Sequence, residues 1–114
     1  MTFDEALAFA LTLPDTEAGT SYGKPAVKVA SNGRAFLFPS HESATSFAIA
    51  MDLDTIEILK ATDPETFWQT AHYIGWEGVL IRYECKDEER VREVIGGARD
   101  FVAAKPRAKP RKRK

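Results

Sequence analysis

Apolar residues recur at helical spacing near both ends of the chain and at alternate positions in its middle. Thr2 and Glu5 have the spacing of a capping box, which predicts a helix that begins at Phe3 and that Pro14 ends. A last helix is expected to begin after Asp87, because an aspartate in that place accepts hydrogen bonds from the free N–H groups of the first turn. Its buried stripe is expected to consist of Val91, Val94, Ile95, Ala98 and Val102.

Alternation of large apolar and small or polar side chains predicts strands between residues 20 and 51. Asn32-Gly33 is a pair favoured in two-residue type I′ turns, which require positive φ at both positions. A turn centred there pairs residue 29 with 36 and residue 27 with 38, so that four large side chains share one buried face. These are Val27, Val29, Phe36 and Phe38. Further strands are expected around 20–22, at 46–51 and at 78–84.

Taken together, the elements predict an α+β domain over residues 1–104, with two layers and an antiparallel sheet of about five strands. The helices pack on one face, and the order along the chain is α-β-β-β-α-α-β-α. The two middle helices are short and are expected to begin at Asp54 and Asp63. The other face of the sheet is expected to be smooth and nearly uncharged, formed by Ala26, Ala30, Ala35, Leu37, Ala48 and Ala50.

Charge divides the chain into an acidic body and a basic end, although the net charge is only −1. Residues 1–104 contain 17 acidic and nine basic side chains, whereas residues 105–114 contain seven basic side chains and no acidic one. This end also lacks apolar side chains larger than alanine, so we expect a disordered tail that binds phosphates of DNA or RNA. A tail that only aids solubility is the alternative. Its basic residues are Lys105, Arg107, Lys109, Arg111, Lys112, Arg113 and Lys114.

Two further groups of residues are candidates for recognition. Lys24, Lys28 and Arg34 are concentrated in and beside the predicted hairpin, which could act as a wing on nucleic acid, or could simply be solvated. A second candidate is a loop that combines a histidine with aromatic residues, and loops often carry function. Its members are His72, Tyr73 and Trp76, which could alternatively plug the end of the sheet.

The residues that catalysis or metal binding requires are scarce. Cys85 is the only cysteine, and His41 and His72 are the only histidines, 31 positions apart. Neither histidine has the spacing of a zinc site, and no phosphate loop or dinucleotide fingerprint occurs. We therefore expect no enzyme activity, no cofactor and no metal. The absence of a long apolar run and of a secretory signal predicts a cytoplasmic protein without a membrane partner.

Several segments resemble the MmcQ/YjbR-like family of bacterial proteins. They are Ser-Tyr-Gly-Lys-Pro-Ala-Val-Lys-Val at 21–29, Asp-Pro-Glu-Thr-Phe at 63–67, Thr-Ala-His-Tyr-Ile-Gly-Trp at 70–76 and Val-Leu-Ile-Arg at 79–82. The resemblance spans about residues 3–102. It implies an α+β fold similar to bacterial secretion chaperones, and a DNA-binding role through a double-wing shape, with no catalytic residues.

Two functions from different classes follow. The first is weak, largely sequence-independent binding of nucleic acid through the basic tail, with the hairpin as a possible wing. The alternative is a protein-interaction or homodimerisation module that uses the alanine-rich face of the sheet. In either case we expect a monomer or a weak homodimer.

Overall fold

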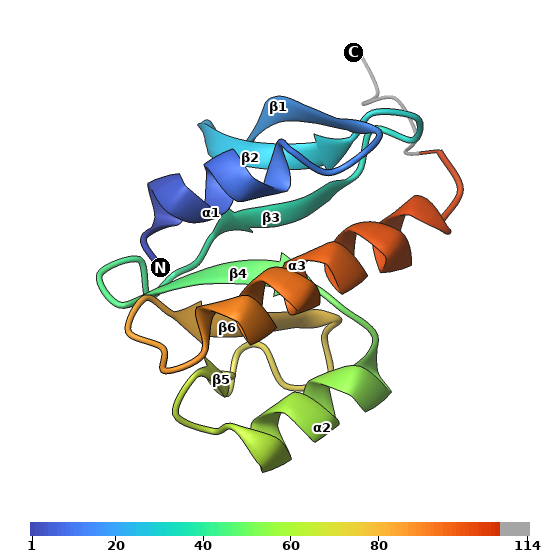
Figure 1. Ribbon diagram of the computed structural model, residues 1–114. Coiled ribbons are helices and arrows are strands. Elements are labelled where there is room, and N and C mark those ends of the chain that lie inside the picture. The colour runs from blue at the N-terminus through green and yellow to red at the C-terminus, as the bar shows by residue number, and fades with distance from the viewer. Residues whose placement is uncertain (108–114) are drawn as a thin grey trace.

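The computed structural model describes residues 1–107, in which six antiparallel strands form one sheet and three helices contribute to a single core against it (Figure 1). The strand order is β1-β2-β3-β4-β6-β5. The α+β prediction is thus confirmed. The elements are α1 (Phe3–Ala10), β1 (Thr16–Ser21), β2 (Lys24–Val29), β3 (Ala35–Pro39), β4 (Ser46–Ala50), α2 (Leu53–Thr62), β5 (Phe67–Trp68), β6 (Gly78–Arg82) and α3 (Glu88–Ala103).

Side-chain caps define where the helices begin. Thr2 and Glu5 form the predicted capping box, in which each side chain accepts a hydrogen bond from the other's backbone N–H. Asp87 caps α3, as predicted, by accepting from the Arg90 N–H at 3.0 Å. The cap of α2 is Asp52, which accepts from the Thr55 N–H at 2.9 Å, so this helix begins one residue before the predicted Asp54.

The core lies between the sheet and the helices. The α3 stripe is buried as predicted, except that Val94 is only half-buried. Strands β2, β4 and β6 supply alternate residues to this core, because successive side chains of a strand point to opposite faces. These buried strand residues are Val27, Val29, Phe47, Ile49, Val79 and Ile81.

A β-bulge in β3 overturns the predicted hairpin register. Val27 pairs with Leu37, while its neighbour Lys28 pairs with Ala35, so Phe36 is an extra residue on β3. Phe36 and Leu37 consequently both lie in the core against the helices. Phe38 is shifted to the opposite face, where it packs with a separate cluster. The predicted placement of Phe38 in the helix-facing core is therefore wrong.

The loop between β2 and β3 is longer than the predicted two-residue turn. The Gly33 N–H donates to the Val29 carbonyl at 2.8 Å, and only Gly33 of the Asn32-Gly33 pair has positive φ, at 73°. The Asn32 side chain instead donates to the carbonyls of Val102 at 2.7 Å and Lys105 at 3.2 Å. This loop is therefore shaped by its attachment to the end of α3.

The two-residue turn with positive φ at both positions lies one hairpin earlier. Tyr22 has φ 53° and Gly23 has φ 78°, and they connect the paired residues Ser21 and Lys24. These are the φ signs of a type I′ turn. The expected strand around 20–22 is accordingly a full strand, β1, followed by this turn.

The short helix expected after Asp63 is also absent. Residues 64–66 form a turn, and β5 follows, with Phe67 opposite Ile81 and Trp68 opposite Leu80. Pairing with β6 buries Phe67 in the core, which outweighs the local helix-start signal of Asp-Pro-Glu. Within residues 1–107, no helix has the length and apolar character needed to cross a membrane.

Candidate functional site

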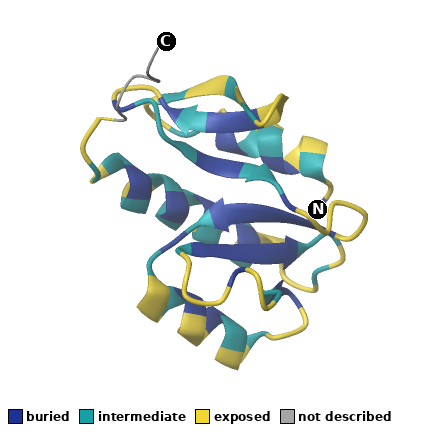
Figure 2. Cartoon of the chain, turned by 180° about the vertical axis from the view of Figure 1, so that it is seen from behind, coloured by how far each residue is buried: buried dark blue, intermediate teal, exposed yellow. Residues whose placement is uncertain are grey.

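The face of the sheet opposite α1 and α3, here called the open face, is not left bare (Figure 2). A row of side chains crosses it from β3 to β5, formed by Phe38, Ala48, Leu80 and Trp68. Tyr73, only 5% exposed, packs on this row from the segment 69–77, here called the covering loop. Gln69 anchors the loop by donating to the carbonyls of Gly78 at 2.8 Å and Tyr73 at 3.3 Å.

The Trp76 ring also lies over the sheet, directly above Gly78. A Cβ at Gly78 would lie 2.1 Å from the Trp76 ring, so only glycine allows the indole this close. The ring centroid of Trp76 lies 5.0 Å from that of Tyr73, edge to face, and 6.0 Å from that of Phe38. Trp76 is still 48% exposed and forms a wall that faces solvent.

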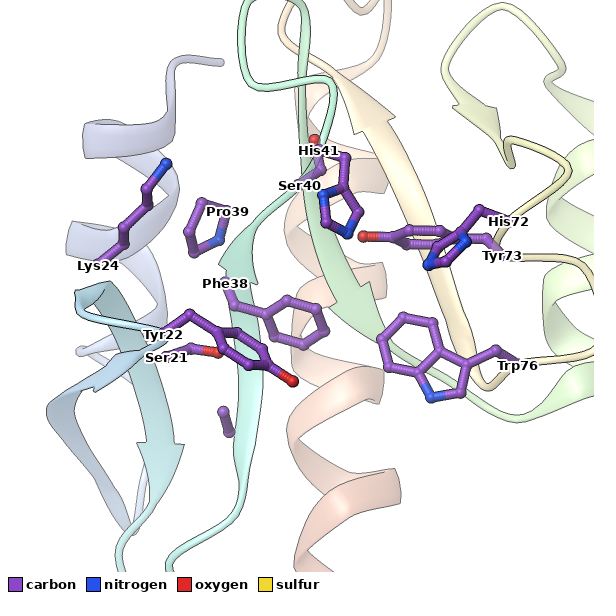
Figure 3. A pocket seen from close by; sticks show the side chains of 11 residues that line it. Ser21, Tyr22, Lys24, Phe38, Pro39, Ser40, His41, His72, Tyr73 and Trp76 are labelled. Atoms are coloured by element: carbon purple, nitrogen blue, oxygen red, sulfur yellow. The ribbon is translucent and has the colours of Figure 1, made fainter.

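Between the covering loop and the β1–β2 turn the open face is hollowed into a cleft of about 840 Å³ (Figure 3). Phe38 lies in the middle, with Tyr22 on the side of the turn and Trp76 on the side of the loop. The two histidines lie along one rim. The full lining is Ser21, Tyr22, Lys24, Ala35, Phe38, Pro39, Ser40, His41, His72, Tyr73 and Trp76.

The lining carries no carboxylate among residues 1–107, although this part of the chain contains 17 acidic side chains. Lys24, two imidazoles and two phenols supply the ionisable groups. The rings of His41 and His72 lie 5.5 Å apart and nearly perpendicular. Burial raises the pKa of the Tyr73 phenol, and a hydrogen bond with the His41 backbone offsets part of that rise. The described lining therefore contains no acidic side chain, and burial favours the protonated form of the Tyr73 phenol.

Tyr22 is held in a backbone conformation that side chains other than glycine, asparagine and aspartate rarely adopt. Its side chain is fully exposed. The position thus combines a strained backbone with a large aromatic ring on the edge of the cleft.

The three basic residues of the predicted wing do not form one surface. Lys24 belongs to the cleft, at the first position of β2. Lys28 is half-buried, and its aliphatic carbons pass over Gly19, where an added Cβ would lie 2.9 Å from Cε. Arg34 lies beyond the other end of β2, where its Nε donates to the Pro106 carbonyl at 2.7 Å.

The first residues assigned to the tail contact the body of the protein. Lys105 Nζ lies 3.3 Å from a Glu77 carboxylate oxygen and 4.5 Å from the centre of the Phe101 ring. Arg107 donates to the Ser31 carbonyl at 2.9 Å. The other basic tail residues lie outside the described residues: Lys109, Arg111, Lys112, Arg113 and Lys114.

The alanine-rich surface proposed for homodimerisation is largely absent. Ala26 and Ala48 are buried, and Leu37 lies in the core on the helix side. Tyr73 packs where the sequence indicated a smooth exposed face.

The sequence did bring His72, Tyr73 and Trp76 into one candidate site, and the structure places all three in the cleft. It missed Tyr22, whose partner Gly23 was the available signal for a turn, and His41, which is distant in sequence from the covering loop. In residues 1–107, no group of three or more His, Cys, Asp or Glu side chains could hold a metal ion.

In comparisons with known proteins, no family model, no curated protein and no solved structure matches this chain.

Proposed function

We propose that the protein binds nucleic acid, weakly and with little sequence preference, through a basic surface at the β2–β3 loop and the residues that follow α3. The observation that carries this proposal is the reciprocal contact of two arginines. Arg34 on the loop donates to the Pro106 carbonyl, and Arg107 donates to the Ser31 carbonyl on the loop. The Arg34 guanidinium is thereby fixed against the chain after α3, and the Arg107 guanidinium is fixed against the β2–β3 loop.

The uneven distribution of charge along the chain supports binding at its C-terminal end rather than over the whole surface. Residues 1–107 contain 17 acidic and 11 basic side chains, so their overall charge repels phosphates. Residues 108–114 add five basic side chains and no acid directly after Arg107. Clustered lysines and arginines release condensed counterions on binding, which favours any nucleic acid regardless of sequence. The resemblance to MmcQ/YjbR-like proteins, which are commonly labelled DNA-binding, points in the same direction.

The test compares the full chain with a neutral-tail variant of the same length, in which Lys109, Arg111, Lys112, Arg113 and Lys114 are all replaced by Gln. Fluorescence anisotropy with a labelled duplex of about 20 base pairs gives the affinity at several salt concentrations. If about five side chains meet phosphates, log K falls against log salt with a slope of about −4 to −5. The neutral-tail variant should bind far more weakly, with a slope of about −1 to −2.

Arg34→Gln combined with Arg107→Gln should reduce the slope of the full chain by about 2, because two phosphate contacts are lost. Lys86→Gln is a matched control, since this lysine is exposed and pairs with Glu65 far from the β2–β3 loop. The proposal fails if the neutral-tail variant binds duplex as tightly as the full chain at every salt concentration.

A further inference from the structure

We propose that the cleft on the open face holds one unpaired base of a single-stranded nucleic acid, with the adjoining phosphate near Lys24. This inference rests on the proposed function and specifies which form of nucleic acid the protein prefers and where its base lies. The occupant is defined by two properties of the lining, its aromatic faces and its lack of carboxylates.

The aromatic side chains are arranged as a platform with solvent access. Phe38 lies between Tyr22 and Trp76 in the cleft, and its ring centroid is 6.0 Å from that of Trp76 (Figure 3). Trp76 is held from behind by Tyr73 and by its contact with Gly78, so its position is fixed before a ligand binds. Unstacked bases bind to such rings, and every base has a π-face, which gives affinity without sequence preference.

Tyr22 points to a ligand more specifically than the other rings. The type I′ turn requires positive φ at this position, and φ 53° costs a tyrosine about 1–2 kcal/mol that it would not cost a glycine. Burial of the Tyr22 ring does not offset this cost in the described part of the chain, because the ring is fully exposed. A base stacked in the cleft would give the ring the contact that the free protein lacks.

The charges of the lining select an anion. Lys24, His41 and His72 are the ionisable groups beside the aromatic rings, apart from the tyrosines. Lys24 would repel a cationic ligand, and no carboxylate lines the cleft among residues 1–107 to offset that repulsion. A planar ring joined to a phosphate satisfies both parts of the site.

The basic surface and the cleft are linked through the covering loop. Lys105 Nζ contacts the carboxylate of Glu77, which follows Trp76 directly in the chain. The end of α3 and the covering loop therefore lie side by side. A paired duplex cannot place a base in the cleft, because its bases are stacked and hydrogen-bonded inside the helix.

The experiment titrates the full chain with a labelled 12-nucleotide oligothymidine, and in parallel with a labelled hairpin duplex. Anisotropy reports total binding. Stacking on Trp76 is measured by quenching of tryptophan fluorescence in the Trp68→Phe background, where Trp76 is the remaining tryptophan. Thymidine monophosphate is added in a third arm to test a free nucleotide as the occupant.

Tyr22→Gly is the decisive variant, because glycine adopts positive φ without strain and the fold is preserved. We expect its affinity for oligothymidine to fall about 5- to 150-fold, the range for losing one stacked base, with duplex binding unchanged. Ile74→Ala is the matched control, since Ile74 is an exposed side chain of the covering loop outside the lining. It should bind both probes as the parent chain does.

The two proposals fail in different ways. If tail-dependent, salt-dependent binding persists but Tyr22→Gly binds oligothymidine normally and Trp76 is not quenched, the base site is wrong and the basic surface stands. If neither probe binds at low salt, the proposed function itself is wrong. If thymidine monophosphate quenches Trp76 at the same concentration as the oligonucleotide, the cleft is a free-nucleotide site and the single-strand proposal is overturned.

Discussion

The two faces of the sheet are built in different ways. On the helix side, aliphatic and phenylalanine side chains from the three helices and the strands form one continuous core. On the open face, a smaller cluster forms where aromatic side chains from β3, β5 and the covering loop meet over Ala48 and Leu80. The first face is packed throughout, whereas the second is packed at one end and hollow at the other.

If the cleft binds a ligand as proposed, the helix side supplies stability and the open face supplies binding. Periodic aliphatic positions bury their whole surface and leave nothing for a ligand. The open face keeps the rings of Tyr22 and Trp76 exposed beside ionisable groups, at the junction of segments far apart in sequence. Substitutions on the helix side should therefore change mainly the free energy of unfolding, while those around the cleft should change mainly binding.

Two neighbouring phenylalanines of β3 distinguish the two faces most directly. The bulge places Phe36 in the helix-side core, fully buried, and Phe38 on the open face, half-buried. Phe36→Ala should lower the free energy of unfolding by about 3–5 kcal/mol, because it leaves a cavity among fixed neighbours. Phe38→Ala should cost less than half as much, since its site already adjoins solvent. Urea denaturation of both variants measures the difference.

Equal losses for the two variants would show that both rings share one buried face, as the regular hairpin register requires. That result would remove the bulge and with it the floor of the cleft. A loss below about 1 kcal/mol for Phe36→Ala would contradict the placement of the helix-side core itself.

The next largest effect concerns the contact that fixes the covering loop. Gly78→Ala should lower stability by about 1–3 kcal/mol, because its new Cβ overlaps the Trp76 ring and the indole must move. In a Trp76→Ala background the same substitution should cost little. The double-mutant cycle, measured by thermal denaturation, should give a coupling of at least about 1 kcal/mol. Additive effects would mean that Trp76 does not rest on the sheet.

The parts of the fold that the sequence predicted are those encoded by nearby residues. The capping box of α1, the Asp87 cap and the stripe of α3 each depend on side chains within a few turns of one helix. The hairpin register was wrong because Phe36, Leu37 and Phe38 are all apolar, so the alternation carries no mark of where the bulge falls. Asn32 likewise looked like a turn residue, although its side chain is bound to α3.

The candidate site was predictable only in part for a related reason. His72, Tyr73 and Trp76 are close in sequence and were identified together. Tyr22 and His41 join them through strand pairing, which brings the β1–β2 turn and the end of β3 to the same face. No local pattern contains that information.

A smaller effect on stability is expected from removing the side-chain cap of α2. Asp52→Ala should lower the free energy of unfolding by about 1 kcal/mol at neutral pH, because α2 loses its cap. The hydrogen bond from the Thr55 N–H holds the pKa of Asp52 below its usual value of 3.8. The cap therefore stabilises the fold above that pH, and its contribution is lost as the pH falls through the lowered pKa.

The difference in stability between the parent chain and Asp52→Ala should consequently narrow on acidification below about pH 4. Asp54→Ala is the matched control, because this exposed aspartate lies in the first turn of the same helix without capping it. A difference that stays constant down to pH 2 would show that the Asp52 carboxylate charge is irrelevant to the cap.

The smallest effect should come from Tyr22→Gly, and its sign matters more than its size. Relief of positive φ stabilises the fold by about 1–2 kcal/mol, while glycine's greater freedom in the unfolded chain removes about 0.5–1 kcal/mol. The net gain is expected to lie between zero and about 1.5 kcal/mol, measured as an unchanged or slightly higher melting temperature. A clear loss of stability would show that the Tyr22 ring packs against the protein in solution and supports the fold. An unchanged or higher melting temperature together with weaker oligothymidine binding would show that Tyr22 contributes to binding at the cleft and not to the stability of the core.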